Sequence, residues 1–158
     1  MGPTGAFASL SSITIRELRR EDYDSWIELW AGFLHFYRAE VGEQVTAATF
    51  ERLCRETDGM FGLVAADADE QLVGLAHSVV HPSTWSLNGY CYLEDLFVAR
   101  AARGTDVAKR LIEATAAAAR ARGVDRLYWQ TQQFNGPARS LYDTVGQLTS
   151  MVVYERDL

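Results

Sequence analysis

The sequence predicts a single mixed α/β domain in which helices cover both faces of one sheet. Segments with the two-residue period of strands and the 3.6-residue period of helices follow one another in the order β-α-α-β-β-β-α-β-α-β. A length of 158 residues suits one domain, and 48% hydrophobic with 23% charged residues is typical of a globular protein. We expect residues 1–12 to be a flexible leader and residues 13–158 to form the domain.

The first half of the chain contains three predicted strands and two predicted helices. Residues 13–18 alternate apolar and polar side chains, as a half-buried strand does. From Glu21 to Tyr37 apolar residues recur at three and four positions, and two acidic residues in the first turn suit the helix dipole. A second, shorter helix begins at Thr46 or Ala47 and ends at Arg55. Two further strands surround a hairpin loop, at residues 61–66 and 72–80.

The second half is predicted to contain a loop, three strands and two helices. Residues 81–89 form the loop, and residues 90–98 form a long strand. A helix over residues 106–122 is closed by Gly123 at the position after its C-cap. Another helix begins near Pro137, with Asn135 as its N-cap, and continues to about residue 145. The remaining predicted strands lie at residues 126–132 and 148–156.

Charge, cysteine and histidine content argue against several classes of function. A net charge of −6 and a pI near 5.0 do not suit a broad nucleic-acid surface, and the sequence has neither a membrane-spanning stretch nor a signal pattern. Cys54 and Cys91 show no CxxC spacing, which favours reduced thiols and a cytoplasmic location. His77 and His81 share one face of a strand without further Cys or His, so we expect no metal.

Residues 93–110 carry the strongest functional signal. An apolar strand that holds Glu94 and Asp95 leads into a short basic turn, and a helix follows at once. Unpaired N–H groups in the first turn of a helix bind anions, and the helix dipole adds about half a positive charge. The turn is too short for a Walker P-loop and lacks the spacing of a dinucleotide fingerprint. Asp106 has the wrong charge for this role, and we expect it to turn outward.

A second motif lies downstream, where Asn135, Ala138, Leu141 and Tyr142 follow the spacing Asn-x-x-Ala-x-x-Leu-Tyr. The two motifs in this order resemble those of the GNAT superfamily of acyl-CoA-dependent N-acetyltransferases, over about residues 13–156. In that family the first motif is Arg/Gln-x-x-Gly-x-Gly/Ala. It is matched here at Arg103 and Ala108, whereas Asp106 stands where glycine is expected.

Three shorter stretches narrow the resemblance within the superfamily. Residues 92–98 look like the strand shared by polyamine acetyltransferases and the small histone and D-amino-acid acetyltransferases. Residues 81–85 and 127–131 are more similar to the second of these branches. The resemblance implies a GNAT fold, acetyl-CoA as co-substrate and a primary amine as acceptor. That amine is a polyamine, an amino acid or a basic protein side chain. It also implies a homodimer that pairs through C-terminal strands.

The resemblance assigns two catalytic roles. Glu94 would be the general base that takes a proton from the amine, and Tyr142 the general acid that protonates the leaving thiolate of CoA. A backbone N–H within residues 96–98, the segment after Glu94, would stabilise the oxyanion. Asn135 would bond to the pantetheine arm or serve only as an N-cap. The residues expected to contact CoA are Leu96, Phe97, Val98, Arg103, Gly104, Thr105, Asp106, Val107, Ala108, Lys109, Asn135, Ala138 and Tyr142.

The acceptor is expected to meet aromatic and acidic side chains. Asp95, predicted to point to the opposite face of the strand from Glu94, would be structural or would line the acceptor entrance. The residues expected to contact the acceptor are Trp30, Phe33, Tyr37, Trp85, Glu94 and Asp95. An alternative reading is a non-catalytic acyl-CoA-binding sensor or interaction module, which Asp106 alone favours.

Overall fold

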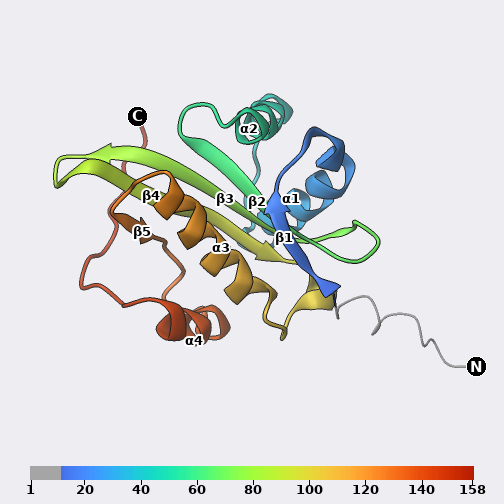
Figure 1. Cartoon of the computed structure of the whole chain (residues 1–158). Coiled ribbons are helices and arrows are strands. Elements are labelled where there is room, and N and C mark those ends of the chain that lie inside the picture. The colour runs from blue at the N-terminus through green and yellow to red at the C-terminus, as the bar shows by residue number, and fades with distance from the viewer. Residues whose placement is uncertain (1–11) are drawn as a thin grey trace, which may run out of the picture.

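The computed structural model describes residues 12–158 as one mixed sheet with helices on both faces (Figure 1). Residues 1–11 of the predicted leader lie outside the described part. Within residues 12–158, no helix has both the length and the apolar character needed to cross a bilayer. The elements are β1 (Thr14–Glu17), α1 (Tyr23–Tyr37), α2 (Glu43–Arg55), β2 (Met60–Ala66), β3 (Leu72–Ser83), β4 (Ser86–Val98), α3 (Val107–Ala121), β5 (Arg126–Tyr128) and α4 (Gly136–Val145).

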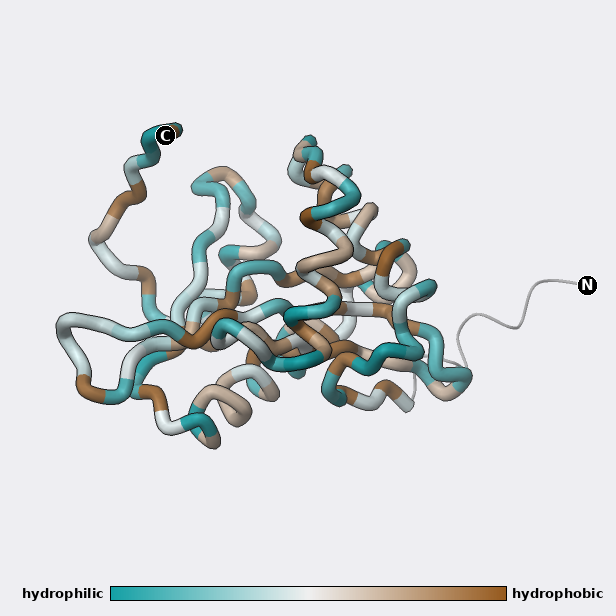
Figure 2. The backbone as a smooth tube through the Cα atoms, turned by 90° about the horizontal axis from the view of Figure 1, so that it is seen from above, coloured by the Kyte–Doolittle hydropathy of each residue, from teal (hydrophilic) through white to brown (hydrophobic). Residues whose placement is uncertain are grey.

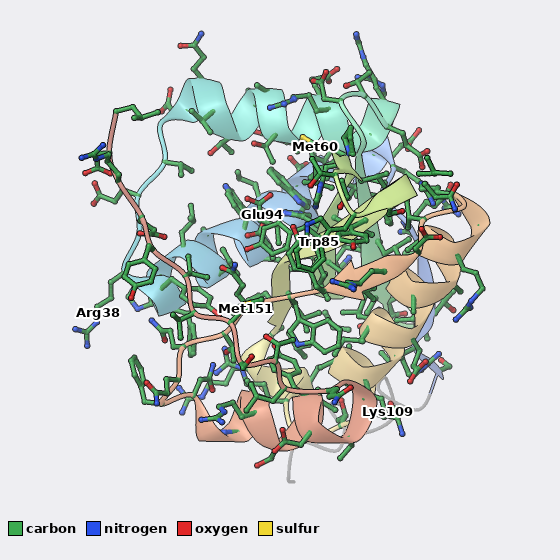
Figure 3. All side chains as sticks on the ribbon, turned by 90° about the vertical axis from the view of Figure 1, so that its left-hand side faces the viewer. Arg38, Met60, Trp85, Glu94, Lys109 and Met151 are labelled. Atoms are coloured by element: carbon green, nitrogen blue, oxygen red, sulfur yellow. The ribbon has the colours of Figure 1, made fainter. Side chains whose placement is uncertain are left out.

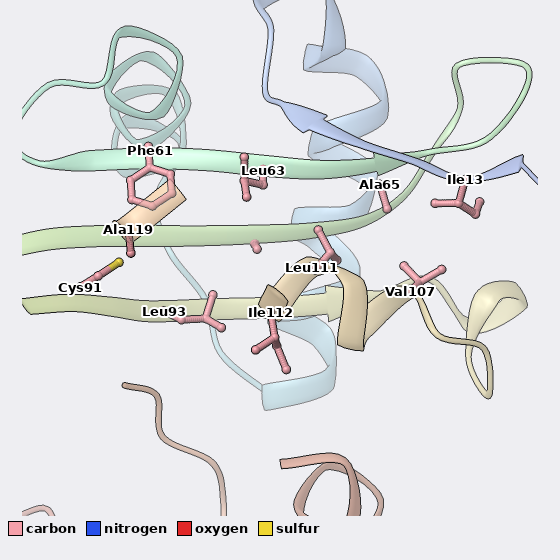
Figure 4. Packing of buried hydrophobic residues seen from close by; sticks show 11 residues of the cluster. Ile13, Phe61, Leu63, Ala65, Cys91, Leu93, Val107, Leu111, Ile112 and Ala119 are labelled. Atoms are coloured by element: carbon pink, nitrogen blue, oxygen red, sulfur yellow. The ribbon is translucent and has the colours of Figure 1, made fainter. Parts of the chain in front are cut away.

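The five strands follow the order of the sequence, β1-β2-β3-β4-β5, and form one sheet. All neighbours are antiparallel except β4 and β5, which are parallel and joined through α3. One core lies between the sheet and α3, where Leu111 and Ile112 contact residues of the strands (Figure 4). A second core lies on the opposite face, where Trp26 and Trp30 of α1 and Phe50 of α2 pack on the sheet.

The sheet opens between β4 and β5. The two strands pair only from Tyr90 to Tyr92 on β4, whereas the other edge of β4 is paired with β3 as far as Val98. The predicted strand over residues 126–132 therefore ends early, at Tyr128. Trp129, the next residue, packs edge-on against Tyr142 of α4. The chain leaves the sheet at this point, so β4 has a free edge beyond Tyr92.

The predicted loop at residues 81–89 is wrong, because β3 and β4 continue through most of it. His81 pairs with Tyr90 and Ser83 with Ser86, which leaves a turn of two residues. The glycine at position 89 is the reason that a loop was predicted. Gly89 has a φ of +82° and lies close to the carbonyl of His81, so it is accommodated within β4 and does not end the strand.

The predicted strand at residues 148–156 is also wrong. These residues form no strand, and their apolar side chains are exposed. Figures 1 and 2 show this segment running away from the sheet, with hydrophobic residues along it. A strand needs an edge with which to pair, and β5 offers only three residues.

Candidate active site

A β-bulge at Glu94 determines where the two carboxylates of β4 point. His77 of β3 pairs with Asp95, whereas the next residue, Ser78, pairs with Leu93, so Glu94 has no partner. The extra residue shifts the alternation of side chains. Leu93 and Leu96 both face α3, whereas Asp95 faces α1 through its contact with His77.

Glu94 and Asp95 therefore lie on the same face of the sheet, and the expectation that they point to opposite faces was wrong. The two side chains interact electrostatically with each other and with Tyr92. Regular alternation would have separated them. The unpaired residue at the bulge interrupts this alternation, and the two carboxylates therefore share one face.

The environment of Glu94 favours its neutral form. Partial burial is the largest cause that raises the pKa of this carboxyl, the charge of Asp95 raises it further, and His77 opposes the shift. The side chain still reaches solvent. Within residues 12–158 it forms no hydrogen bond or ion pair. A carboxylate with a raised pKa, open to solvent and free of partners, suits proton transfer.

Three tyrosines surround the acidic pair. Tyr37 ends α1, and burial together with the charge of Asp95 raises its pKa. Tyr92 and Tyr128 stack with ring centroids 5.0 Å apart, and burial followed by the charge of Glu94 raises the pKa of Tyr92. The Tyr128 hydroxyl lies 2.7 Å from Nε2 of His81. Sequence reasoning missed Tyr92 and Tyr128 as site residues. The alternation of β4 relative to Glu94 is the signal that could have found Tyr92.

The other aromatic residues expected at the acceptor site occupy three different environments. Trp30 is buried, donates its indole N–H to Thr46 and stacks on Phe33. Phe33 in turn contacts Tyr37 and Phe97, behind the acidic pair. Trp85 lies in the turn of the β3–β4 hairpin and is 78% exposed. Figure 3 views the molecule from the side of this turn, so the labels of Trp85 and Glu94 overlap although the two residues are far apart along β4. Eight residues of β4 lie between Trp85 and Glu94, a distance of about 30 Å along the strand.

The free edge of β4 presents backbone donors. The N–H of Ala99 donates to the carbonyl of Val73 on β3 at 2.8 Å. Successive N–H groups along a strand point to opposite edges, so the N–H of Phe97 also faces β3. The N–H groups of Leu96 and Val98 face the free edge. Two of the three residues expected to hold an oxyanion therefore have donors available there.

The loop before α3 has the backbone of an anion site. Gly104 has a φ of +77°, whereas Asp106 is the exposed N-cap of α3 with a φ of −83°, which any residue adopts. Lys109 is exposed on the first turn of α3 (Figure 3). Val107 is buried in the α3 core, so only its backbone could face a ligand. No other residue of 12–158 accepts from the N–H groups of Gly104, Thr105, Asp106, Ala108 and Lys109.

Arg103 is directed toward β4. Its Nε donates to the carbonyl of Val98 at 3.1 Å, and its guanidinium lies over the rings of Phe97 and Phe36. The positive charge therefore stands where the free edge of β4 meets the loop.

Helix α4 closes the other side of the open edge. The side chain of Asn135 caps the helix by accepting from the N–H of Ala138 at 3.3 Å. Two turns later Tyr142 packs against Trp129, and burial, followed by the charge of Tyr37, raises the pKa of Tyr142 to about 12. The hydroxyl of Thr131 is buried without a partner in the described chain, which fits a polar group bound in the open edge.

Comparisons with known proteins agree with this geometry. The chain matches the acetyltransferase (GNAT) family over residues 15–146. It is 30% identical over 146 residues to the D-amino-acid N-acetyltransferase HPA3 of Saccharomyces cerevisiae, covering 92% of this chain and 91% of that protein.

Two solved structures share the fold. The aminoglycoside N-acetyltransferase AAC(6')-Iy, in complex with a bisubstrate analogue, gives a TM-score of 0.80 at 20% identity and covers 94% of this chain and 99% of its own. A Trypanosoma brucei acetyltransferase gives a TM-score of 0.71 at 22% identity, covering 93% of this chain and all of its own.

The fold, with a sheet that opens beside the N-terminus of a helix, is that of an acyl-CoA-dependent acyltransferase. The family match covers most of the chain, and the chain therefore belongs to the GNAT family. It is an acetyl-CoA-dependent N-acetyltransferase. Membership in a family of enzymes, with an enzyme as a curated relative, favours catalysis over the alternative of a binding module.

Proposed function

We propose that the protein transfers an acetyl group from acetyl-CoA to a primary amine by direct attack in a ternary complex, with Glu94 as base and Tyr142 as acid. The observation that carries this proposal is the free edge of β4. The acidic pair lies on the face beside it, and Tyr142 approaches from α4. Tyr37 lies within electrostatic range of both sides, since Asp95 raises the pKa of Tyr37 and Tyr37 raises the pKa of Tyr142.

The proton transfers follow from the two perturbed groups. An amine with a pKa of about 10.4 arrives as an ammonium and first releases one proton to solvent past Glu94. The neutral nitrogen attacks the thioester carbonyl, and Glu94 takes a second proton as the N–C bond forms. The C–S bond then breaks, and Tyr142 gives its proton to the departing sulfur. With a pKa of about 12, this phenol is protonated at neutral pH, so it can donate. Solvent afterwards reprotonates Tyr142 and deprotonates Glu94.

The N–H groups of Leu96 and Val98 would stabilise the oxyanion of the tetrahedral intermediate, because both face the free edge. The N–H of Phe97 faces β3, so Phe97 would contact CoA only through its side chain, which packs against Phe33 of α1. These donors belong to a strand that is paired along its other edge, so they need no rearrangement during the reaction.

The loop before α3 would bind the pyrophosphate of CoA. Its unpaired N–H groups are the donors, and Lys109 adds positive charge. Arg103, which belongs to this loop and is bonded to the carbonyl of Val98 at the end of β4, would add a second positive charge. Asn135 and Ala138 would line the pantetheine arm at the start of α4. Support for CoA as co-substrate comes from the GNAT match and from structural neighbours solved with CoA or a CoA bisubstrate analogue.

The acceptor would bind beside Glu94 and Asp95, against Tyr37. Trp30 and Phe33 would support this wall from the core and would not touch the amine directly. Trp85 lies too far along the hairpin to join the same wall. The curated relative acts on D-amino acids by its name, which makes a primary amine the acceptor to test first.

A thiol-release assay with acetyl-CoA and a panel of amines tests the proposal. The panel should contain alkylamines, diamines, D- and L-amino acids and a lysine-containing peptide. Calorimetric titration with acetyl-CoA serves as the binding control. Turnover of at least one amine, lost in Glu94→Gln and Tyr142→Phe while acetyl-CoA still binds, would support the assigned roles. Binding of acetyl-CoA without turnover of any amine would contradict them.

We also propose that the protein is a cytoplasmic homodimer. Apolar side chains are exposed at the β3–β4 turn, at Trp85 and Leu87, and along residues 148–154. Both segments lie on the left of Figure 1, the side that faces the viewer in Figure 3. A second copy would cover them and would provide an edge on which residues 148–156 would pair as a strand. The unpaired thiols of Cys54 and Cys91 suit a reducing compartment.

Light scattering behind size exclusion tests the dimer. The full chain should elute as a dimer, and a chain that ends at residue 147 should elute as a monomer. A monomeric full chain at tens of micromolar would contradict this proposal and leave the catalytic one untouched.

A further inference from the structure

Behind Asp95, two hydrogen bonds connect the core to the candidate acceptor site. Trp26 of α1 is fully buried and donates its indole N–H to Nε2 of His77 at 2.9 Å. The other ring nitrogen of His77, Nδ1, lies 2.9 Å from Oδ2 of Asp95. An indole N–H can only donate, so Nε2 of His77 is the acceptor and Nδ1 carries the proton. His77 therefore donates to Asp95.

The surroundings of His77 hold its ring in this orientation. The side chain is 3% exposed, and its ring centroid lies 5.8 Å from that of Trp26 and 5.4 Å from that of Trp30. The two indoles stack on each other. Turning the imidazole would leave the Trp26 N–H without an acceptor in the core, which is costly. His77 thus has one tautomer and one direction in which to donate.

Asp95 is fixed, but its charge is not neutralised. Its side chain is 16% exposed, and within residues 12–158 neither Asp95 nor Glu94 forms an ion pair with a lysine or arginine. The contact to His77 comes from a neutral ring. His77 lowers the pKa of Glu94, but no lysine or arginine shifts the pKa values of Tyr37, Tyr92 or Glu94. Two neighbouring carboxylates in a partly enclosed site favour a ligand that supplies positive charge.

We propose, building on the function proposed above, that Asp95 binds a second ammonium group of the acceptor and that His77 is the positioning residue that aims it. The reacting nitrogen must lose its charge beside Glu94, so it cannot neutralise Asp95 as well. An amine that carries another ammonium can serve both carboxylates. The acceptor class is therefore a diamine or longer polyamine. An amino acid would instead bring its own carboxylate close to two like charges.

A matched pair of acceptors tests this inference. Putrescine and butylamine have the same carbon chain and differ in the second ammonium. The readout is the ratio of their kcat/KM values in the thiol-release assay. We expect wild-type protein to prefer putrescine by at least about tenfold, as for one hydrogen bond to a charged group. D-alanine in the same assay shows whether an acceptor with its own carboxylate is used.

Substitutions separate positioning from folding. Asp95→Asn and His77→Leu should each lower the preference for putrescine to near one, mainly by raising KM for putrescine. His77→Asn should restore part of the preference, because its amide can take the place of Nδ1 as donor. The double variant with Asp95→Asn and His77→Leu should lose no more of the preference for putrescine than Asp95→Asn alone, since His77 acts through Asp95. His35→Leu, at an exposed histidine of α1, is the matched control and should keep the preference.

Thermal melting and the KM for acetyl-CoA, measured for every variant, show whether each protein is folded. The inference is wrong if wild-type protein turns over butylamine and putrescine equally well. It is also wrong if folded His77→Leu loses both activities in parallel, because that would be a structural effect. If none of the amines is turned over, the proposed function itself fails and this inference with it.

Discussion

Replacing Glu94 with glutamine should separate catalysis from stability in a single variant. The carboxylate reaches solvent, so water can take over part of the proton transfer. We therefore expect kcat/KM for the amine to fall by about 10²-fold, the lower end of the range for general base catalysis. The pH dependence should change as well. In wild-type protein, activity falls as the pH drops through the raised pKa of Glu94, and the variant should lack this limb.

The same substitution should leave the fold intact. A carboxyl whose pKa is raised by folding destabilises the native state above its unfolded pKa, because the ionised form is disfavoured there. At pH 7.5 the variant should therefore melt at the same temperature as wild-type protein or slightly higher. No hydrogen bond between Glu94 and another residue of 12–158 is lost. Glu113→Gln, on the exposed face of α3, is the matched control and should behave as wild type in both measurements.

The decisive measurement is kcat/KM from about pH 5, near the ordinary pKa of a carboxyl, up to pH 9.5, with and without a small added base. If Glu94 is the base, the loss in Glu94→Gln should shrink as the pH rises, because hydroxide or the added base replaces the missing carboxylate. A loss of equal size at every pH, without rescue by added base, would refute the assignment and leave Glu94 a role in binding only.

Three further substitutions probe the other sites. Tyr142→Phe should lower kcat by about 10²-fold while acetyl-CoA still binds, because the ring keeps its contact with Trp129, and steady-state kinetics would show this. With its pKa of about 12, Tyr142 should produce no alkaline limb below pH 10 in wild-type protein. Asp106→Gly should tighten acetyl-CoA binding in calorimetric titration, since it removes a negative charge beside the phosphate loop; unchanged or weaker affinity would contradict this. Asp22→Asn should lower the free energy of unfolding by about 3 kcal/mol at pH 7, because it breaks the partly buried ion pair with Arg16. Burial acts to raise the pKa of Asp22, but hydrogen bonds from Arg16 and the Arg19 backbone lower it overall. The contribution of the pair is therefore complete above the unfolded pKa of about 3.9 and is lost as the pH falls through the lower folded value. The difference between wild type and variant in urea titrations should therefore shrink as the pH falls below about 3.9.

Local signals predicted the helices around the site well. The 3.6-residue period and Gly123 gave a helix over residues 106–122, and α3 spans Val107–Ala121 with Gly123 at a φ of +79°. Asn135 was expected to cap a helix, and its side chain does accept from the first turn of α4. Both features depend on neighbouring residues in the chain, so they can be read without knowledge of the tertiary structure.

Pairing between strands is where prediction from sequence failed. The bulge at Glu94 is a property of the register between β3 and β4, and no residue type in β4 marks it. The face on which Asp95 lies was therefore predicted wrongly. Residues 148–156 failed for a related reason: their apolar pattern suits a strand, but a strand forms only where an edge is available. The residues of the anion loop were predicted as a site, but the direction of Arg103 toward Val98 needed the structure.

Most of the proposed catalytic groups lie on β4 because this strand is paired along one edge and unpaired along the other. Pairing with β3 fixes the backbone from Asp95 to Val98, so the N–H groups of Leu96 and Val98 point to a known place. The bulge immediately before this segment releases Glu94 from the ladder. His77, the partner of Asp95 across the strands, also contacts its side chain. The register between β3 and β4 thus places a buried histidine where it can orient Asp95 at the acceptor site. A substitution at His77 should therefore alter the preference between amines more strongly than the affinity for acetyl-CoA.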